Sequence, residues 1–582
     1  MSALSRHPYR IVAALGAGAL LTGGCGQLPT PDKVRTVRHI AADAPDFGAP
    51  EVRKLPAGPL PGEQPADVVR GFIAAAADPS ARHALSRSFL ARGAKWDDAA
   101  TTVVYDPTSV TTTVAKSAPD RAAVTLRLNT ELVADRDGGY RPALTTITRR
   151  YDVIRSDGQW RLAGVPAGVL VTWRDVARSY RAVRLYAISA TGDMLVPDPV
   201  LLDTDRPALP TTAMRAQLRA PTDWLSSAAG TAVPPDASLL GSATLVDQTV
   251  TADLSLPSMP TSASSRLALV AQLRAMLSSL PGVKQVRLLI DGTEAAVPPG
   301  NAPDNPDTTP PDGPAVALVA GRLVPVGPSH QGSTDISTPA ATVGNAVVSV
   351  SAGTSGELAA STSSGTVLWR ANSSVAMSSA PNTWTSVSWV RSLGLLGVEK
   401  NTGALAFLPP RGAPTAVDDG GLSKIGPVHA VSVSRDGARV AAIVGPPGAQ
   451  RVYLGHLAYT PPFPADTSPG QEPTVVGAAD WTPVTAVGDN VRAVDWTSSL
   501  GLAVIVDNGP HGGTAVRQIP LDGPAVPTTL SLRGLPGPAE AIAAAPGEPV
   551  LVSSGGRIWR YDDTGAGRWL AIGPGNLPAY PS

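Results

Sequence analysis

The stretch VSVSRDGARVA, residues 431–441, decides how the C-terminal half of the chain is interpreted. It contains a short strand with alternating apolar side chains, a turn at Asp436-Gly437 and a second apolar strand that continues through Val440. Two such strands joined by an Asp-Gly turn are typical of an antiparallel hairpin. The stretch therefore predicts β-structure, and similar patterns recur on both sides of it.

The hairpin pattern repeats loosely, with a period of about 40 to 60 residues. Candidate repeats begin near Ala346, Ser386, Ala430, Ala493 and Ala541. Several short strands per repeat predict an all-β propeller of five or six blades over residues 315–582. A closed ring of blades also protects the edges that an open sheet of this size would expose. A two-sheet sandwich is the alternative fold, although it explains the repetition less well.

Two further strands are expected just before the first repeat, at residues 316–319 and 322–326. We expect them to complete the last blade and so close the ring. The preceding residues 301–314 are rich in Pro, Asp, Asn and Thr. This composition predicts a linker between the propeller and the modules before it.

Residues 65–190 are predicted to form an α+β domain of cone-like shape. Its first helix, which Asp67 would cap, carries Val68, Val69 and Phe72 on one apolar face. A second helix is expected around residues 85–90. The expected strands are 101–105, 122–128, 144–154 and 159–163, with hairpin turns at 137–139 and 156–158.

Residues 191–300 are predicted to form a second α+β domain. Ser264 or Ser265 would cap an amphipathic helix whose stripe of leucines has a plain explanation as core. A buried strand is expected at residues 285–290. The helix followed by VRLLIDG, residues 286–292, resembles the GerMN module, which is common in exported proteins. Nothing in this domain looks catalytic.

Composition sets limits on the class of protein. A chain of 582 residues is too long for a single core, so several domains are expected. It carries 47 Lys+Arg and 47 Asp+Glu, a balance that gives no support for nucleic-acid binding. The 57 Gly and 58 Pro indicate many turns. Cys25 is the only cysteine, so the chain cannot form an internal disulfide.

The first 24 residues have the pattern of a secretory signal peptide. Arg6 and Arg10 precede an uncharged apolar segment, residues 11–21, which is too short to span a bilayer comfortably as a helix. The small residues Gly23 and Gly24 then lead to Cys25. An ordinary cleaved signal followed by a chance cysteine is the alternative interpretation.

The run LLTGGC, residues 20–25, resembles a bacterial lipobox. The resemblance implies signal cleavage between Gly24 and Cys25, and an S-diacylglyceryl group and an N-acyl chain such as palmitate on Cys25. Thr22 departs from the pattern, which prefers leucine three positions before the cysteine. Two or three acyl chains anchor a protein stably, whereas one binds a membrane only marginally. The proline-rich residues 25–64 would then act as a tether to membrane lipid.

No local motif indicates an enzyme, a metal site or a cofactor. The seven histidines lie far apart, and neither a serine-nucleophile elbow nor a phosphate-binding loop follows the signal segment. We interpret Asp418-Asp419 and Asp562-Asp563 as turn residues, and Arg70 and Arg87 as solvated helix charges rather than ligands. We therefore expect no catalytic residues, metal or cofactor. A propeller site assembled from separate blades would escape this search.

Over essentially its full length the chain resembles the actinobacterial LpqB lipoprotein family. The resemblance rests on residues 21–25, on VRGF at residues 69–72 with Phe89-Leu90 and Trp96, and on the order of the modules. It implies a lipid-anchored, extracytoplasmic, non-enzymatic accessory of an MtrB-type sensor histidine kinase. That kinase belongs to the MtrAB two-component system, which acts in cell-envelope homeostasis and division. A propeller-based hydrolase and a lipoprotein that binds cell-wall ligands are the alternative functions.

Overall fold

The computed structural model describes ten segments of the chain. They are residues 58–203, 208–326, 346–354, 356–362, 365–369, 383–410, 412–460, 472–508, 512–524 and 526–582. Residues 42–582 form one compact unit, and the structural statements below concern its described part. The predicted signal peptide, Gly24, Cys25 and most of the tether lie outside the described residues, so their roles stay predictions.

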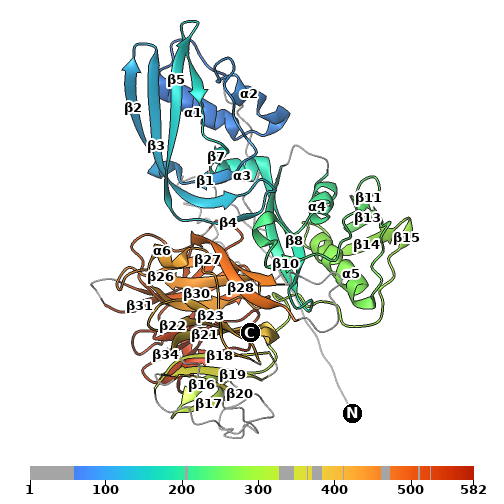
Figure 1. Ribbon diagram of the computed structural model, residues 1–582, viewed down its shortest axis with the longest axis vertical. Helices are drawn as coiled ribbons and strands as arrows, with labels where there is room; N and C mark the ends of the chain where they lie inside the picture. Colours follow the sequence, from blue (N-terminus) through green and yellow to red (C-terminus); the bar gives the residue numbers. More distant parts are fainter. Residues whose placement is uncertain are drawn as a thin grey trace, which may run out of the picture. The chain divides into compact units, whose positions relative to one another are not determined.

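The first module packs helix α1 (Pro65–Ala76) against a seven-stranded sheet (Figure 1). The strand order is β6-β5-β3-β1-β7, and β2 and β4 also pair with β3. The other elements are α2 (Ala84–Arg87), β1 (Thr102–Tyr105), β2 (Thr111–Ala118), β3 (Arg121–Ala134), β4 (Tyr140–Pro142), β5 (Thr146–Ser156), β6 (Gln159–Gly164), β7 (Val169–Val171) and α3 (Trp173–Ser179). The α+β class predicted for this module is confirmed.

The predicted cap of α1 is wrong by one turn. Gln64 is the N-cap residue, and Asp67 lies three residues later. The two side chains form a capping box, in which the Gln64 N–H donates to Asp67 Oδ2 at 3.4 Å. Val68, Val69 and Phe72 are buried, as the apolar face predicted. The expected second helix is a single turn, α2, and Phe89 lies beyond its end.

The second module begins with β8 (Tyr180–Ser189), earlier than the predicted start at residue 191. This strand pairs with β9 (Leu195–Asp203) and β10 (Ala229–Gly230), so it does not end the first module. A second sheet combines β11 (Ser238–Leu239), β12 (Thr244–Val246), β13 (Thr249–Ser255), β14 (Gln285–Ile290) and β15 (Thr293–Glu294). Helices α4 (Leu209–Gln217) and α5 (Ala263–Ser278) complete the module, and α5 connects the parallel pair β13 and β14.

Helix α5 begins one residue before the expected caps. Ser262 is the N-cap residue, and its hydroxyl accepts a hydrogen bond from the Ser265 N–H at 3.0 Å. The apolar stripe is core, as predicted, since Leu273 and Leu277 are both fully buried. Strand β14 has the bounds that the sequence predicts.

Residues 301–314 are not a free linker. Asp304 accepts a hydrogen bond from the Leu195 N–H on β9 at 2.8 Å. Asp307 Oδ1 accepts from the Ser499 N–H of the propeller at 2.7 Å, and the Pro310 carbonyl accepts from Arg435 at 2.8 Å. The segment is therefore bonded both to the second module and to the propeller.

The C-terminal module consists of six sheets in the part of the chain that is described. Four sheets have four strands, and two have three. Their strands are β16 (Ala315–Val319), β17 (Arg322–Val326), β18 (Val347–Ala352), β19 (Leu358–Thr362), β20 (Gly365–Trp369), β21 (Trp384–Val390), β22 (Gly394–Glu399), β23 (Leu405–Leu408), β24 (Thr415–Ala416), β25 (Val428–Val433), β26 (Arg439–Val444), β27 (Arg451–Thr460), β28 (Thr474–Pro483), β29 (Val491–Ser498), β30 (Gly501–Asp507), β31 (Thr514–Pro520), β32 (Thr528–Thr529), β33 (Ala541–Ala543), β34 (Leu551–Ser554), β35 (Arg557–Asp562), β36 (Arg568–Pro574) and β37 (Asn576–Ala579). The predicted propeller is confirmed.

The ring closes through the last strand of the chain. Strand β37 pairs with β16, with Val316 opposite Ala579, and β16 pairs with β17. Strand β37 also contacts β33 and β18, the first strands of the two neighbouring sheets. The two early strands thus complete the last blade, as predicted. The five predicted repeats begin within two residues of β18, β21, β25, β29 and β33.

Serine side chains connect the first strands of successive blades. Ser386 and Ser388 on β21 accept hydrogen bonds from the backbone N–H groups of Val431 and Val433 on β25, at 3.2 and 2.9 Å. Two serines of β18 accept from β21 in the same way. An inner strand exposes one row of backbone groups beyond its own sheet, and such groups need partners when they are buried. The serine hydroxyls provide them.

Candidate functional site

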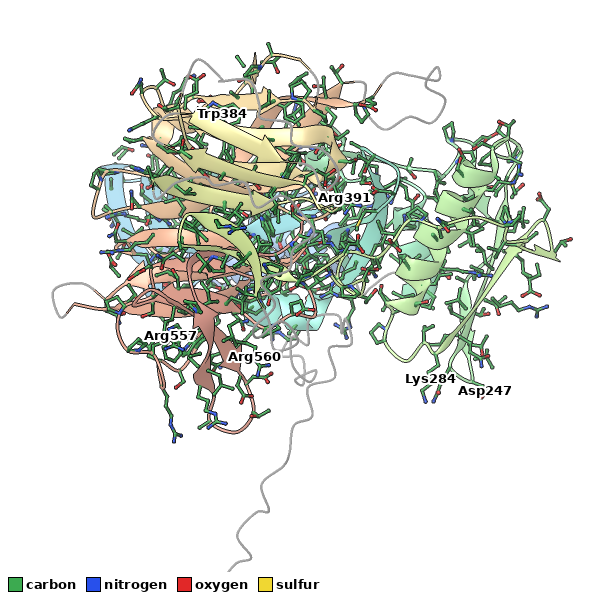
Figure 2. The ribbon with its side chains drawn as sticks, turned by 90° about the horizontal axis from the view of Figure 1, so that it is seen from below. Asp247, Lys284, Trp384, Arg391, Arg557 and Arg560 are labelled. Atoms are coloured by element: carbon green, nitrogen blue, oxygen red, sulfur yellow. The ribbon has the colours of Figure 1, made fainter. Side chains whose placement is uncertain are left out.

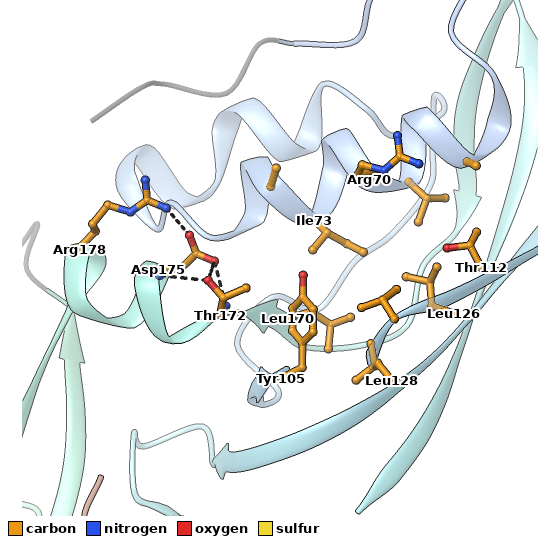
Figure 3. Close-up of a pocket in the computed structure, with 14 residues that line it drawn as sticks. Arg70, Ile73, Tyr105, Thr112, Leu126, Leu128, Leu170, Thr172, Asp175 and Arg178 are labelled. Carbon is orange, nitrogen blue, oxygen red and sulfur yellow. Dashed lines mark hydrogen bonds and ion pairs between the residues drawn. The ribbon is translucent and has the colours of Figure 1, made fainter. Parts of the chain in front are cut away.

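The first module contains a cavity of about 450 Å³ between α1 and the sheet (Figure 3). Helix α1 contributes Val69 and Ile73 to its wall, and β3 contributes Leu126 and Leu128. Leu170 on β7 lies on the same wall. The volume falls within the range of roughly 300 to 1,000 Å³ that is common for small-molecule sites.

Tyr105 is the main polar side chain within the cavity. It lies at the end of β1, and its ring points into the hollow toward Ile73 and Leu170 (Figure 3). Burial and the nearby Asp175 carboxylate raise the pKa of Tyr105, so its phenol stays protonated at neutral pH. Its hydroxyl has no hydrogen-bond partner among the described residues. It is therefore available as a donor to a bound group.

Asp175 has little remaining capacity for chemistry. Its Oδ2 accepts hydrogen bonds from the Thr172 N–H at 2.9 Å and from the Thr172 hydroxyl at 2.7 Å. Its Oδ1 accepts from Arg178 at 2.5 Å, as Figure 3 shows. The bond from the Thr172 N–H and the reciprocal bond from the Asp175 N–H to the Thr172 hydroxyl, at 3.4 Å, form the capping box of α3. Asp175 therefore acts as a structural group on the cavity wall.

The two arginines that the sequence singled out have different surroundings. Arg70 donates to Asp67 Oδ1 at 2.8 Å, and its side chain is 74% exposed at the edge of the cavity. Arg87 donates to Asp98 at 2.7 Å and lies over the ring of Trp96. The solvated helix charge predicted for Arg70 is confirmed, but the sequence did not indicate that Arg70 borders a cavity.

The paired acids hold turns, as predicted. Asp419 accepts hydrogen bonds from the backbone N–H groups of Gly421 at 2.8 Å and Ser423 at 3.0 Å. These bonds lower the pKa of Asp419 against the opposing effect of its burial. Asp562 accepts from the Thr564 hydroxyl at 2.7 Å. Within the described segments, no group of three or more His, Cys, Asp or Glu side chains could hold a metal ion.

One Ser–His–Asp series, which the sequence search missed, joins the second module to the propeller. Ser227 Oγ lies 3.1 Å from His456 Nδ1, and His456 Nε2 lies 3.2 Å from Asp480 Oδ2. His456 is 5% exposed, and its ring packs nearly perpendicular to that of Trp224, with an interplanar angle of 83°. Because the ring is this enclosed, we interpret the series as a contact between modules. The separation of 229 positions from Ser227 to His456 hid the series from a search for local motifs.

A second contact between these modules involves Arg391, which lies at the side of the propeller (Figure 2). Its guanidinium pairs with Asp193, in the turn between β8 and β9. Arg439, on β26, is 1% exposed and pairs with Asp436 at 3.4 Å. It also donates to the Pro197 carbonyl on β9. Buried polar bonds and a shared apolar core therefore hold the second module to the propeller.

Comparison with protein families agrees with this modular order. Residues 58–177 match the model described as "Lipoprotein LpqB, N-terminal domain". Residues 184–296 match "Sporulation and spore germination", and residues 316–581 match "Lipoprotein LpqB beta-propeller domain". The chain belongs to the LpqB lipoprotein family.

Relatives named "Lipoprotein LpqB" occur in several actinobacteria. The protein of Thermobifida fusca (strain YX) is 29% identical over 303 residues, which cover 50% of this chain and 48% of that protein. The protein of Nocardia farcinica (strain IFM 10152) is 31% identical over 192 residues, 32% of this chain and 30% of that protein. The chain thus aligns with about half the length or less of these LpqB relatives.

Solved structures match parts of this LpqB-family chain at low similarity. The tandem GerMN domains of GerM from Bacillus subtilis are 18% identical, with a TM-score of 0.18, over 21% of this chain and 43% of that chain. The putative TolB from Agrobacterium tumefaciens is 12% identical, with a TM-score of 0.30, over 40% of this chain and 83% of that chain.

None of the helices in the described segments has the length and apolar character needed to cross a bilayer.

Proposed function

We propose that this chain is a lipid-anchored accessory protein that binds the extracytoplasmic domain of an MtrB-type sensor histidine kinase and modulates its signalling. The observation that carries the proposal is the order of the LpqB-type modules behind a lipobox-like N-terminus. In this account Cys25 carries the acyl chains, and the protein works on the outer face of the cell membrane in envelope homeostasis and division.

Tethering gives the accessory role a physical basis. Two proteins held at one membrane meet at a raised effective concentration, so a weak contact between them becomes significant. The bonded module boundaries support this role, because a contact made by one module is then mechanically coupled to the others. The bonds from Asp304, Asp307 and Arg439 lie on these boundaries.

We place the kinase contact on the outer edge of the second module. Strand β12 pairs with β13 on one side, and among the described strands its other side is unpaired. Its residues Leu245 and Val246 are 40% and 64% exposed. An exposed apolar edge strand favours pairing with another chain. The unpaired backbone edge and the exposed apolar side chains of β12 suit pairing with an extended segment of the kinase domain.

Crosslinking in native membranes tests the proposal. The wild-type chain and Cys25→Ala would be expressed at equal levels and crosslinked before detergent is added, and the captured proteins identified by mass spectrometry. We expect the sensor kinase with the wild type and much less with Cys25→Ala. Recovery of the kinase with neither form, or a hydrolytic turnover by the purified chain, would refute the proposal.

A further inference from the structure

We propose that the cavity of the first module binds a single-chain anionic amphiphile, with the apolar chain inside and the acidic head group beside Arg70. This site goes beyond the accessory role proposed above and does not depend on it. A fatty carboxylate is the simplest member of the ligand class.

The interior of the cavity suits an apolar chain. Val69 and Leu128 are each 1% exposed, and Leu126 and Leu170 are each 6% exposed, so the wall is part of the core of the module. Ile73 and Val110 are only half-buried where the cavity opens. Covering this water-exposed apolar surface with an apolar ligand lowers the free energy, so it favours binding.

The opening of the cavity carries a cationic group with free donors. Arg70 makes one ion pair, through Nη1 to Asp67, and none of its other N–H groups has a protein partner among the described residues. Arg178 stands at the opposite end of the cavity, as Figure 3 shows. Asp175 is the only acid on the wall, and its two oxygens are bonded to Thr172 and Arg178. The lining of the main cavity, with Arg70 and Arg178 against Asp175, therefore carries a net positive charge, whereas Glu63 and Asp67 line the neighbouring hollow beside Arg70.

A shallow second hollow extends the site beyond Arg70. It is lined by Glu63, Asp67, Gly71 and Phe89, and it shares Arg70 and Ala74 with the main cavity. Arg70 thus stands where the two hollows meet. An acidic head group on the main-cavity side of Arg70, away from Glu63 and Asp67, remains in contact with water while its chain lies between α1 and the sheet.

The arrangement favours an amphiphile over a sugar or a peptide. Glycan binding needs several convergent polar groups, whereas the wall here is mainly aliphatic. Tyr105 offers one hydroxyl inside the cavity and Thr112 another near its edge. These two groups can hold a single oxygen or a water molecule beside the chain.

The test uses the chain from residue 26 onward, which lacks the signal segment and the lipid. Laurate and dodecanol serve as probes, because they share the chain and differ in the charge of the head group. Binding would be measured by isothermal titration below the concentration at which laurate forms micelles. We expect both probes to bind, laurate more tightly.

Two variants and one control separate the parts of the site. Arg70→Gln should weaken laurate binding about threefold to fivefold, as expected for an exposed ion pair, and leave dodecanol binding unchanged. Ala74→Phe, at an exposed position of α1, should fill the opening and reduce the binding of both probes at least tenfold. Arg92→Gln, an exposed arginine that does not line the cavity, should bind like the wild type. Thermal unfolding confirms that the variants fold.

Three results would overturn the proposal. The first is that laurate does not bind the folded wild-type chain. The second is that folded Ala74→Phe binds both probes with wild-type affinity. The third is that the probes bind only after residues 26–57 are also removed, which would assign the cavity to that part of the chain. None of these results bears on the kinase contact, because that contact is assigned to the second module.

Discussion

Asp198 accepts two hydrogen bonds from Thr222, one from its backbone N–H at 2.7 Å and one from its hydroxyl at 3.0 Å. The carboxylate lies on β9 and is 1% exposed. Burial raises the pKa of Asp198 from 3.8 to about 6, against the opposing effects of the Thr222 bonds and the Arg439 charge. The pair therefore links the stability of the second module to pH.

Stability should fall as the pH rises from about 4 to about 6. In this window the folded chain keeps the proton on Asp198, whereas the unfolded chain releases it. The free energy of unfolding therefore decreases as the pH rises. The raised pKa corresponds to a contribution of roughly 3 kcal/mol to the free energy of unfolding. This contribution is present below the window and lost above it. Asp198→Asn has no proton to lose in this window and can keep both contacts with Thr222, because its amide oxygen can accept from the Thr222 N–H while its amide nitrogen donates to the Thr222 hydroxyl. Urea unfolding from pH 4 to 7 should show the decline in the wild type relative to the variant, and parallel curves would contradict the assignment.

Replacing Arg439 by alanine should destabilise the chain strongly. The change leaves the buried carboxylate of Asp436 without its ion-pair partner and removes the cation that lies over the ring of Trp224. Loss of one partner of a buried pair typically costs about 3 to 5 kcal/mol. Arg70→Ala, which breaks an exposed pair, should cost less than about 1 kcal/mol. Equal losses in urea unfolding would show that Arg439 does not hold the boundary.

Removing residues 576–582 should open the propeller. The truncation deletes β37, so β16 loses one of its two partner strands and keeps only β17, and the Pro549 carbonyl loses the Tyr580 hydroxyl. An opened ring exposes unpaired strand edges, which promote aggregation. We expect rapid proteolysis within residues 316–575 and a loss of monomer on size-exclusion chromatography. A truncated chain as protease-resistant as the wild type would exclude closure through β37.

The cap of α5 can be tested by a pair of serine substitutions. Ser262→Ala removes the hydroxyl that accepts from the Ser265 N–H and should cost about 1 kcal/mol. Ser264→Ala leaves that bond in place and should have a much smaller effect. Urea midpoints compare the two variants, and a larger effect at Ser264 would reassign the cap.

The sequence predicted the blades well because each inner strand has a strong local signature. Apolar alternation and turn residues occur together within about ten positions, as in residues 431–441. Strand β2 escaped prediction because its residues, TTTVAKSA, are almost all exposed and show no apolar period. Its pairing with β3 provides the order that its own sequence does not indicate.

The cavity and the module boundaries could not be predicted from sequence. Val69, Leu126 and Leu128 look like ordinary core residues, and only the packing of α1 on the sheet reveals the space between them. The composition of residues 301–314 predicts a linker, because their hydrogen-bond partners, such as Ser499, lie far away in the sequence. The composition of a segment predicts its local conformation, whereas the cavity and the contacts between modules depend on how distant segments pack in the assembled fold.

Photo-crosslinking from single positions in the native membrane tests the central claim most directly. A photoreactive residue would replace Val246 on β12 or, as the control, Val487, which is 79% exposed on the propeller. The account predicts that position 246 captures the sensor kinase and that position 487 does not. Capture from neither position, or equally from both, would contradict it.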